Sequence, residues 1–410
     1  MLCAQVTPDP GLIARRAFDQ LLAGQYAALH ASFSPQMQAA LSETALREKV
    51  IAPVAALGKP LRIAQPVVVK TSGADVVVIN TTFAAASFDF QFSVMPDGKI
   101  GGLFMRPVQA AGEWTAPAYS RPGAFREREV TFGDPEWKLS GTLTIPAAGK
   151  LSPAVVLVHG SGPNDRDESV GGSKLFRDLA EGLASSGIAV LRYDKRTKTY
   201  GQRMAARNIT LQEETVDDAV AAAAWLGGQR EIDDKRVFVL GHSLGGYALP
   251  RIARRATNVA GLIVLAGSTR PLEDVIVEQT EYLGAPAATL EKMRADAERV
   301  RRIKPGAEPV LGVPASYWLD LKGYDPAREA ADLRVPILVL QGERDYQVTM
   351  RDFANWKAAL GQRQDVRFRS FPALNHLFIA GEGKSLPPEY QRPGHASGEV
   401  LDEIAKWINR

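Results

Sequence analysis

Cysteine is almost absent from this sequence, because Cys3 is the only one among 410 residues. A single thiol cannot form a disulfide within the chain, and it cannot supply the cluster of ligands that a cysteine-based zinc site needs. We therefore expect the fold to depend on a hydrophobic core, for which a chain of this length is ample.

Long apolar runs and a strong net charge are missing as well. No stretch approaches the roughly 20 apolar residues that a transmembrane helix requires, so no membrane span is expected. The formal net charge is only +3, from 49 basic and 46 acidic side chains. Such a balance gives no reason to expect binding to nucleic acid or to an anionic membrane surface.

Cofactor motifs are also missing, since the sequence has no P-loop, no G-x-G-x-x-G and no H-E-x-x-H. Asp165-x-Asp167 faintly resembles a calcium loop, but Val170 stands where that loop requires glycine. We therefore expect neither a nucleotide cofactor nor a metal.

A signal peptide is not recognisable, because Pro8-Asp9-Pro10 follows the first residue closely. Leu2-Cys3-Ala4-Gln5 is alternatively the trimmed end of a secretory or lipoprotein signal, which would make the protein secreted or periplasmic. We favour an ordinary terminus, and a cytoplasmic location is then the expectation.

What the sequence does contain is a nucleophile motif in a specific context. The apolar residues Val237 to Leu240 predict a buried strand and lead into Gly241-His242-Ser243-Leu244-Gly245, a G-x-S-x-G motif. From Tyr247 on, apolar residues recur at helical spacing. A strand, a sharp turn and a helix are the context of a nucleophile elbow, in which a strained turn exposes the serine hydroxyl. Glycines are needed there because a Cβ would collide with the neighbouring strand or helix.

Across residues 126–410 the chain resembles the α/β-hydrolase superfamily, and within it the serine esterases related to S33-type aminopeptidases and dienelactone hydrolases. The resemblance implies an α/β-hydrolase fold with a catalytic triad in the order serine, acid, histidine. Apolar strands that alternate with helices independently predict a mostly parallel sheet covered on both faces. The expected strands are 153–159, 188–193, 237–240, 260–266, 335–341 and 366–371, after a hairpin of 127–132 and 139–145, and the expected helices are 175–183, 211–226, 353–360 and 400–408.

A serine hydroxyl is a poor nucleophile unless a base accepts its proton, and the base needs an acid to orient it. Asp345 follows the expected strand 335–341, where the family carries its acid, and Glu343 is the alternative in the same loop. His376 follows the strand 366–371 and matches the family's catalytic histidine. His395, before the last helix, is its competitor.

The tetrahedral intermediate needs backbone N–H groups aimed at its oxyanion. Leu244, directly after the nucleophile, is expected to supply one, and the resemblance places the other at Ser161 in the loop His159-Gly160-Ser161-Gly162. An HGSG loop rather than HGGG argues against the hormone-sensitive-lipase-like branch. The charged loops 163–168 and 193–196 either bind substrate or tie the loops together through ion pairs, and the second alternative is slightly favoured.

The N-terminal part has a different pattern, with helical periodicity over 11–58 followed by strands at 67–70, 74–83, 87–94 and 100–105. This order predicts a small α+β domain, 1–112, that resembles NTF2-like or DUF3887-type domains, joined by a Pro- and Gly-rich linker, 113–125, to the hydrolase domain, 126–410. Within the latter, the charged helical segment 273–332, with an apolar stripe of Leu290, Met293, Ala297 and Val300, is expected to be a lid. An ordinary pair of surface helices is the alternative.

These observations predict a serine hydrolase that cleaves small-molecule carboxylic esters through an acyl-enzyme on Ser243, with Asp345 and His376 completing the triad and no cofactor. An S33-type aminopeptidase or amidase and an acyltransferase would use the same triad. A peptidase would also need a carboxylate near the pocket, for which Asp165, Asp167, Glu168 and the acids of the lid segment are candidates. The remaining alternative, a binding or scaffold protein with a relict triad, is disfavoured by the intact elbow.

Overall fold

The computed structural model describes residues 9–69, 74–84, 87–108, 114–205, 207 and 209–410. The chain divides into two compact units, Met1–Gly112 and Glu113–Arg410. The Cys3 segment and the first residue of the expected linker, Glu113, lie outside the described residues.

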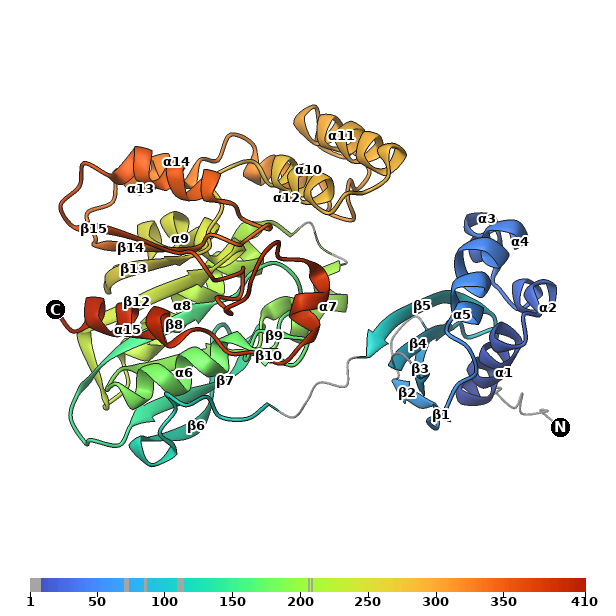
Figure 1. Ribbon diagram of the computed structural model, residues 1–410, viewed down its shortest axis with the longest axis horizontal. Coiled ribbons are helices and arrows are strands. Elements are labelled where there is room, and N and C mark those ends of the chain that lie inside the picture. Colours follow the sequence, from blue (N-terminus) through green and yellow to red (C-terminus); the bar gives the residue numbers. More distant parts are fainter. Residues whose placement is uncertain (1–8, 70–73, 85–86, 109–113, 206, 208) are drawn as a thin grey trace. The chain divides into compact units, whose positions relative to one another are not determined.

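Helices come first in the N-terminal unit, and an antiparallel sheet follows (Figure 1). Its helical elements are α1 (Pro10–Leu22), α2 (Tyr26–Ala31), α3 (Pro35–Ala40), α4 (Glu43–Leu46), η1 (Arg47–Ile51) and α5 (Ala52–Ala56), and its strands are β1 (Arg62–Ile63), β2 (Val67–Val69), β3 (Asp75–Thr82), β4 (Ser87–Val94) and β5 (Ile100–Val108). The strands pair in the order β1-β3-β4-β5, with β2 also on β3. Phe18 of α1 packs edge-on against Phe90 of β4, which joins the two layers.

The second unit alternates strands and helices, as expected from its sequence. Its strands are β6 (Phe125–Phe132), β7 (Leu139–Pro146), β8 (Ser152–Val158), β9 (Ser169–Val170), β10 (Ser173–Lys174), β11 (Ala189–Tyr193), β12 (Ile232–His242), β13 (Val259–Leu265), β14 (Ile337–Gly342) and β15 (Val366–Phe371). Its helices are η2 (Pro122–Ala124), α6 (Leu175–Ser185), α7 (Arg196–Ala205), η3 (Gln212–Val216), α8 (Asp217–Gly227), α9 (Leu244–Arg255), α10 (Leu272–Tyr282), α11 (Ala287–Arg301), α12 (Ala315–Leu321), α13 (Pro326–Ala331), α14 (Met350–Leu360), η4 (Pro387–Gln391) and α15 (Gly398–Ile408). None of the helices in the described ranges is long and apolar enough to cross a bilayer.

In the described part of this unit, one sheet has the order β15-β14-β13-β12-β8-β11-β7-β6. Its strands are parallel from β15 to β11, whereas β7 and β6 add an antiparallel edge. Side chains alternate between the two faces along each strand, so that Val239 of β12 contributes to the core under α8 and α9, and Leu240 to the core under α6 and α15. Figure 1 shows α6 and α15 on one side of this sheet and α9 and α14 on the other. The predicted mostly parallel sheet with helices on both faces is therefore confirmed.

The described part of the expected linker 113–125 is not free but packs on the second unit. Trp114 donates its indole N–H to Asp178 of α6 at 2.9 Å, and the Tyr119 hydroxyl donates to the backbone oxygen of Ala396 at 2.8 Å. Proline and glycine signal only the lack of regular structure, whereas the two aromatic side chains provide contacts that the linker prediction ignored.

The expected lid segment 273–332 contains two kinds of structure. The first part holds α10 and α11, and α11 carries the predicted stripe, of which Ala297 and Val300 are buried and Leu290 and Met293 half-buried. From α12 on, however, the chain joins the main core through Tyr317, Leu321, Tyr324, Ala327 and Ala330. The C-terminal part of the segment thus packs with the helices of the sheet, which apolar spacing could not show, because it marks a buried face without telling what covers it.

Helix α7 is a further difference from the expected loop after strand 188–193. Its sequence, RTKTYGQRMA, has few apolar residues and bends at Tyr200, where the backbone leaves helical geometry. Apolar periodicity could not reveal such a helix.

Candidate active site

The loop around Ser243 has the geometry of a nucleophile elbow. Ser243 joins the end of β12 to the start of α9 with φ 53° and ψ −114°, a conformation that costs energy in any residue with a side chain. A Cβ on Gly241 would collide with the backbone of Gly245, and one on Gly245 would collide with the carbonyl of Val158. The tight turn therefore needs both glycines, and it leaves Ser243 half-buried between buried neighbours.

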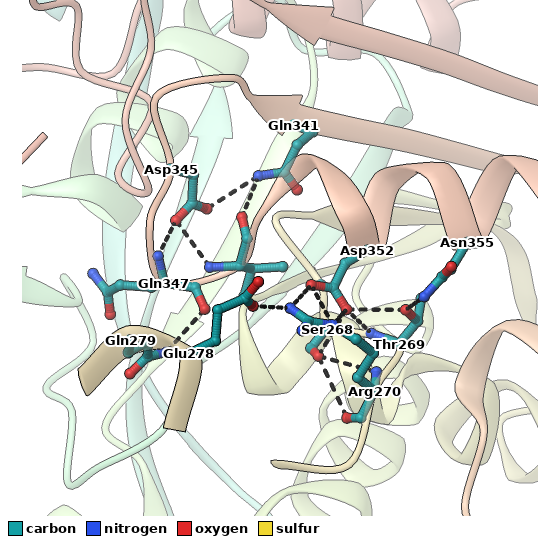
Figure 2. Close-up of polar contacts among 12 residues, drawn as sticks. Ser268, Thr269, Arg270, Glu278, Gln279, Gln341, Asp345, Gln347, Asp352 and Asn355 are labelled. Atoms are coloured by element: carbon teal, nitrogen blue, oxygen red, sulfur yellow. Dashed lines mark hydrogen bonds and ion pairs between the residues drawn. The ribbon is translucent and has the colours of Figure 1, made fainter. Parts of the chain in front are cut away.

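Asp345 and His376 form a hydrogen-bonded pair in the interior. His376 Nδ1 lies 2.6 Å from Asp345 Oδ2, and both side chains are at most 5 % exposed. The backbone N–H groups of Gln347 and Val348 donate to Asp345 Oδ1 at 2.7 and 3.0 Å, and Gln341 donates to Oδ2 at 3.1 Å (Figure 2). The carboxylate is thus fixed from several sides, and a histidine whose Nδ1–H faces it keeps Nε2 available for proton exchange.

The sheet brings this pair to the elbow. Ser243 follows β12, Asp345 follows β14 and His376 follows β15, and all three strands run parallel. Their carboxyl ends therefore lie at one edge of the sheet, which is where ligands bind in such folds. The His376 ring packs on His242, directly before Ser243, with ring centroids 4.7 Å apart.

The competing residues have other partners. His395 Nδ1 lies 3.0 Å from Asp178 Oδ1, and Asp178 Oδ2 accepts the backbone N–H of Ala396 at 2.9 Å. This contact attaches the segment before α15 to α6. Glu343 is exposed and accepts a hydrogen bond from Ser370 at 2.7 Å. Of the predicted acids and bases, the structure therefore brings Asp345 and His376 together and keeps His395 on a different acid.

The loop expected to form the oxyanion hole lies against Ser243. Gly160 donates its N–H to Glu168 Oε1 at 2.6 Å, and its carbonyl accepts from Lys195 Nζ at 2.8 Å. An added Cβ on Gly160 would lie 3.2 Å from the Cβ of Ser243. Ser161, the next residue, and Leu244 line the same cavity.

That cavity has a volume of about 410 Å³ and mostly apolar walls. They include Leu272 and Ile276 of α10, together with Ile209, Val313, Pro314, Tyr317 and Trp318. Among the described residues that line it, the one carboxylate is Glu214, which accepts from Lys195 Nζ and from the Tyr317 hydroxyl, each at 2.6 Å. Because that charge is already paired, the cavity suits an apolar group.

The charged loops 163–168 and 193–196 are tied together by ion pairs. Arg166 bonds Asp194 at 2.8 Å and Glu129 at 2.6 Å, and Asp167 pairs with Lys174 at 2.9 Å and with Arg192. These contacts favour the structural interpretation of the loops over substrate binding.

Sequence reasoning missed the partnership of Glu168 with His242. Glu168 Oε2 lies 3.0 Å from His242 Nδ1, and His242 Nε2 lies 3.0 Å from the backbone oxygen of His376. In the sequence, Glu168 is one of several acids in a polar loop and His242 is the variable residue of the elbow motif. Neither position has a signal that would connect them across 74 residues of chain (242 − 168).

Two protein-family models match this chain, one in each of its two units. The model of the alpha/beta hydrolase family matches residues 155–387, and that of a protein of unknown function, DUF3887, matches residues 14–103. Esterase EstD of Thermotoga maritima is 42% identical over 315 residues, which are 76% of this chain and 74% of that protein.

The solved structures that match this chain have low identity. An esterase of Pyrococcus furiosus is 16% identical, with a TM-score of 0.46 over 74% of this chain and 97% of that one. Est1E of Butyrivibrio proteoclasticus is 18% identical, with a TM-score of 0.46 over 69% of this chain and 99% of its own. The identification depends instead on the family model, which spans more than half of the chain, and on the extensive identity with EstD. This chain belongs to the alpha/beta hydrolase family.

Proposed function

We propose that the protein hydrolyses carboxylic esters through an acyl-enzyme on Ser243, with His376 as the general base and Asp345 as its orienting acid. The identity of 42% with EstD supports the esterase activity. The observation that carries the assignment of residues is the buried Asp345–His376 pair, whose imidazole packs beside the strained Ser243 elbow.

In the acylation half-reaction, Ser243 Oγ attacks the ester carbonyl carbon while His376 Nε2 takes its proton. The negative charge that develops on the carbonyl oxygen is stabilised by the backbone N–H groups of Ser161 and Leu244. His376 then gives its proton to the leaving alkoxide, the carbon–oxygen bond breaks, and the alcohol departs from an acyl-enzyme.

In the deacylation half-reaction, water attacks the acyl carbonyl while His376 accepts its proton. The second tetrahedral intermediate uses the same two N–H groups. When it collapses, His376 returns the proton to Ser243 Oγ and the carboxylic acid leaves. Asp345 remains ionised throughout and stabilises the imidazolium that forms twice in the cycle.

We further propose that one side of the ester, the acyl or the alcohol part, is apolar and occupies the cavity of about 410 Å³ between the oxyanion loop and α10. Burial of an apolar group there is favourable by about 25 cal/mol per Å² removed from water. The paired state of Glu214 supports this choice over a cationic group.

An aminopeptidase activity has less support. It would need a carboxylate free to bind a substrate α-amino group, and the candidates in the loop 163–168 are engaged. Asp165 accepts the N–H groups of Asp167 and Ser169 at 3.1 and 3.0 Å, Asp167 is ion-paired, and Glu168 holds Gly160. Turnover of aminoacyl anilides beside nitrophenyl esters separates the two activities. An acyltransferase would instead give more product when an alcohol or amine is added with the ester.

The decisive experiment labels the protein with a serine-reactive phosphonate and maps the adduct by mass spectrometry. We expect one adduct, on Ser243, with parallel loss of nitrophenyl ester hydrolysis. Ser243→Ala should neither be labelled nor turn over ester, with a loss on the order of a million-fold as for other triad nucleophiles. Ester turnover above a few per cent in this variant, or an adduct on another serine, would reject the assignment.

A further inference from the structure

Behind the proposed triad lies a second acid–histidine pair, and it connects the oxyanion loop to the catalytic histidine. Glu168, only 3 % exposed and at a positive φ of 47°, accepts the Gly160 N–H through Oε1 at 2.6 Å. Its other oxygen lies 3.0 Å from His242 Nδ1, and His242 Nε2 lies 3.0 Å from the backbone oxygen of His376. We propose that Glu168 and His242 are positioning residues that hold Ser161 and His376 in register around Ser243.

The hydrogen-bond chemistry defines the protonation of this pair. A carbonyl oxygen only accepts, so His242 Nε2 must carry a proton that it donates to His376. His242 Nδ1 lies 3.0 Å from Glu168 Oε2 as a close acid–histidine contact, and neither atom has a hydrogen bond in the described part of the chain. One proton must therefore lie between them, because two bare acceptors at 3.0 Å would repel each other.

Burial and charge together favour the ionic form. Burial by itself raises the pKa of Glu168, but the neighbouring charge of His242 outweighs it, and the net shift is downward. Burial likewise acts to lower the pKa of His242, yet the carboxylate of Glu168 and the carbonyl of His376 raise it overall. The pair is thus a buried carboxylate beside an imidazolium, which makes strong, short-range contacts to the two loops.

Both loops need such support because their groups must be placed within tenths of an ångström. The Ser161 N–H must reach the oxyanion, and the His376 ring must reach the proton of Ser243. An oxyanion donor must lie about 2.7–3.1 Å from the charge that it stabilises. Ser161 follows Gly160, whose N–H is held by Glu168 and whose carbonyl is held by Lys195. The imidazole of His376 starts from the backbone that His242 holds. One pair therefore sets the positions of a donor and a base that are 215 residues apart in the chain (376 − 161).

The inference rests on the proposed function, and its consequence is a defect in turnover rather than in substrate binding. Displacement of catalytic groups by about 1 Å costs up to roughly 100-fold in rate. We therefore expect Glu168→Ala and His242→Ala each to lower kcat for nitrophenyl acetate by about 10- to 100-fold with KM changed less than about threefold. A phosphonate should still label Ser243 completely, but more slowly.

If the alanine variants are unstable, the Glu168→Gln variant still tests the proposed positioning role. Its amide oxygen can still accept from Gly160, and its NH₂ group can donate to a neutral His242 whose Nε2–H still bonds His376. This conservative variant should recover most of the lost kcat. The double variant Glu168→Ala/His242→Ala should be no slower than the worse single variant, since the two residues act through each other.

The pair Asp178–His395 provides the matched control, with the same 3.0 Å spacing between an acid and a histidine, and Asp178 bonds Trp114, His395 and Ala396 instead of Gly160 or His376. Asp178→Ala should lower the melting temperature but leave kcat per folded molecule within about twofold. Equal kcat losses for Asp178→Ala and Glu168→Ala, no recovery in Glu168→Gln, or multiplying losses in the double variant would each overturn the positioning role. If the wild type itself gives no adduct on Ser243, the proposed function fails instead, so the two failures are distinguishable.

Discussion

Gln279 of helix α10 donates its side-chain amide to the backbone oxygen of Gln347, two residues after Asp345, at 2.9 Å. Figure 2 shows this bond beside the contacts that fix Asp345, and it shows Arg270, at the base of α10, bonded to Asp352 and Glu278. Asp352 is completely buried and also accepts from Ser268 and Thr269. The first helix of the expected lid is thus attached to the loop that carries Asp345, the proposed catalytic acid.

Replacement of Gln279 by alanine should loosen α10 while the core stays intact. One side-chain bond contributes about 1 kcal/mol, so the melting temperature should fall by only a few degrees. Since Leu272 and Ile276 of the same helix line the apolar cavity, we expect KM for butyrate or longer esters to rise several-fold, with little change for acetate. Thr280→Ala removes a bond within α10, to Ile276, and serves as the control. A uniform change for all esters would show that α10 does not contact the substrate.

Trp318 should limit the length of the group that the cavity accepts. With Leu272 it lines both the cavity of about 410 Å³ and an adjoining cavity of about 300 Å³ beside Tyr247. Trp318→Ala should join the two spaces, so that kcat/KM for octanoate rises relative to acetate by about tenfold, the effect of one or two buried methylenes. Trp407→Ala, at a buried site against Phe238, should cost similar stability without changing this ratio. An unchanged ratio in Trp318→Ala would place the apolar group elsewhere.

Substitution of His376 and substitution of His395, the two candidates for the general base, should have very different effects on ester turnover. His376→Ala leaves an unassisted serine, and we expect turnover at saturating ester to fall by several orders of magnitude. His395→Ala removes a contact to Asp178 and should reduce turnover less than about tenfold. Circular dichroism of both variants shows whether the fold is kept. The opposite ranking would move the base to the segment before α15.

Acid should destabilise the protein partly through His159. Its ring is buried against Phe176 and Tyr193, and burial lowers its pKa from 6.5 to about 4. Between these pH values the unfolded chain binds a proton that the folded protein does not, so the contribution is complete above pH 6.5 and is lost as the pH falls toward 4. Each pKa unit corresponds to about 1.4 kcal/mol, which makes the loss a few kcal/mol.

The measurement is urea unfolding of the wild type and of His159→Phe at several pH values across this window. The phenylalanine retains the ring contacts but cannot be protonated, so the free energy of unfolding should depend less steeply on pH in the variant. Parallel curves would mean that His159 does not contribute to the acid sensitivity.

Much of this protein could be predicted because the relevant signals are local. The elbow is a contiguous strand, turn and helix, and its glycines are required by contacts within a few residues and with the adjacent strand β8. Asp345 and His376 were expected at the ends of strands, where the chain order of the family places them. The parallel sheet could be predicted from the alternation of strands and helices, since the apolar pattern of each element indicates which of its faces is buried.

Only the tertiary structure decided which groups are partners. The sequence contains His376 and His395 and many acids without showing which belong together. The fold pairs His376 with Asp345 and His395 with Asp178. Spacing could not show that Tyr317 and Tyr324 join the main core instead of a lid, nor that Glu168 faces His242. Local periodicity reports that a side chain is buried, whereas the identity of its neighbour depends on how distant segments pack together.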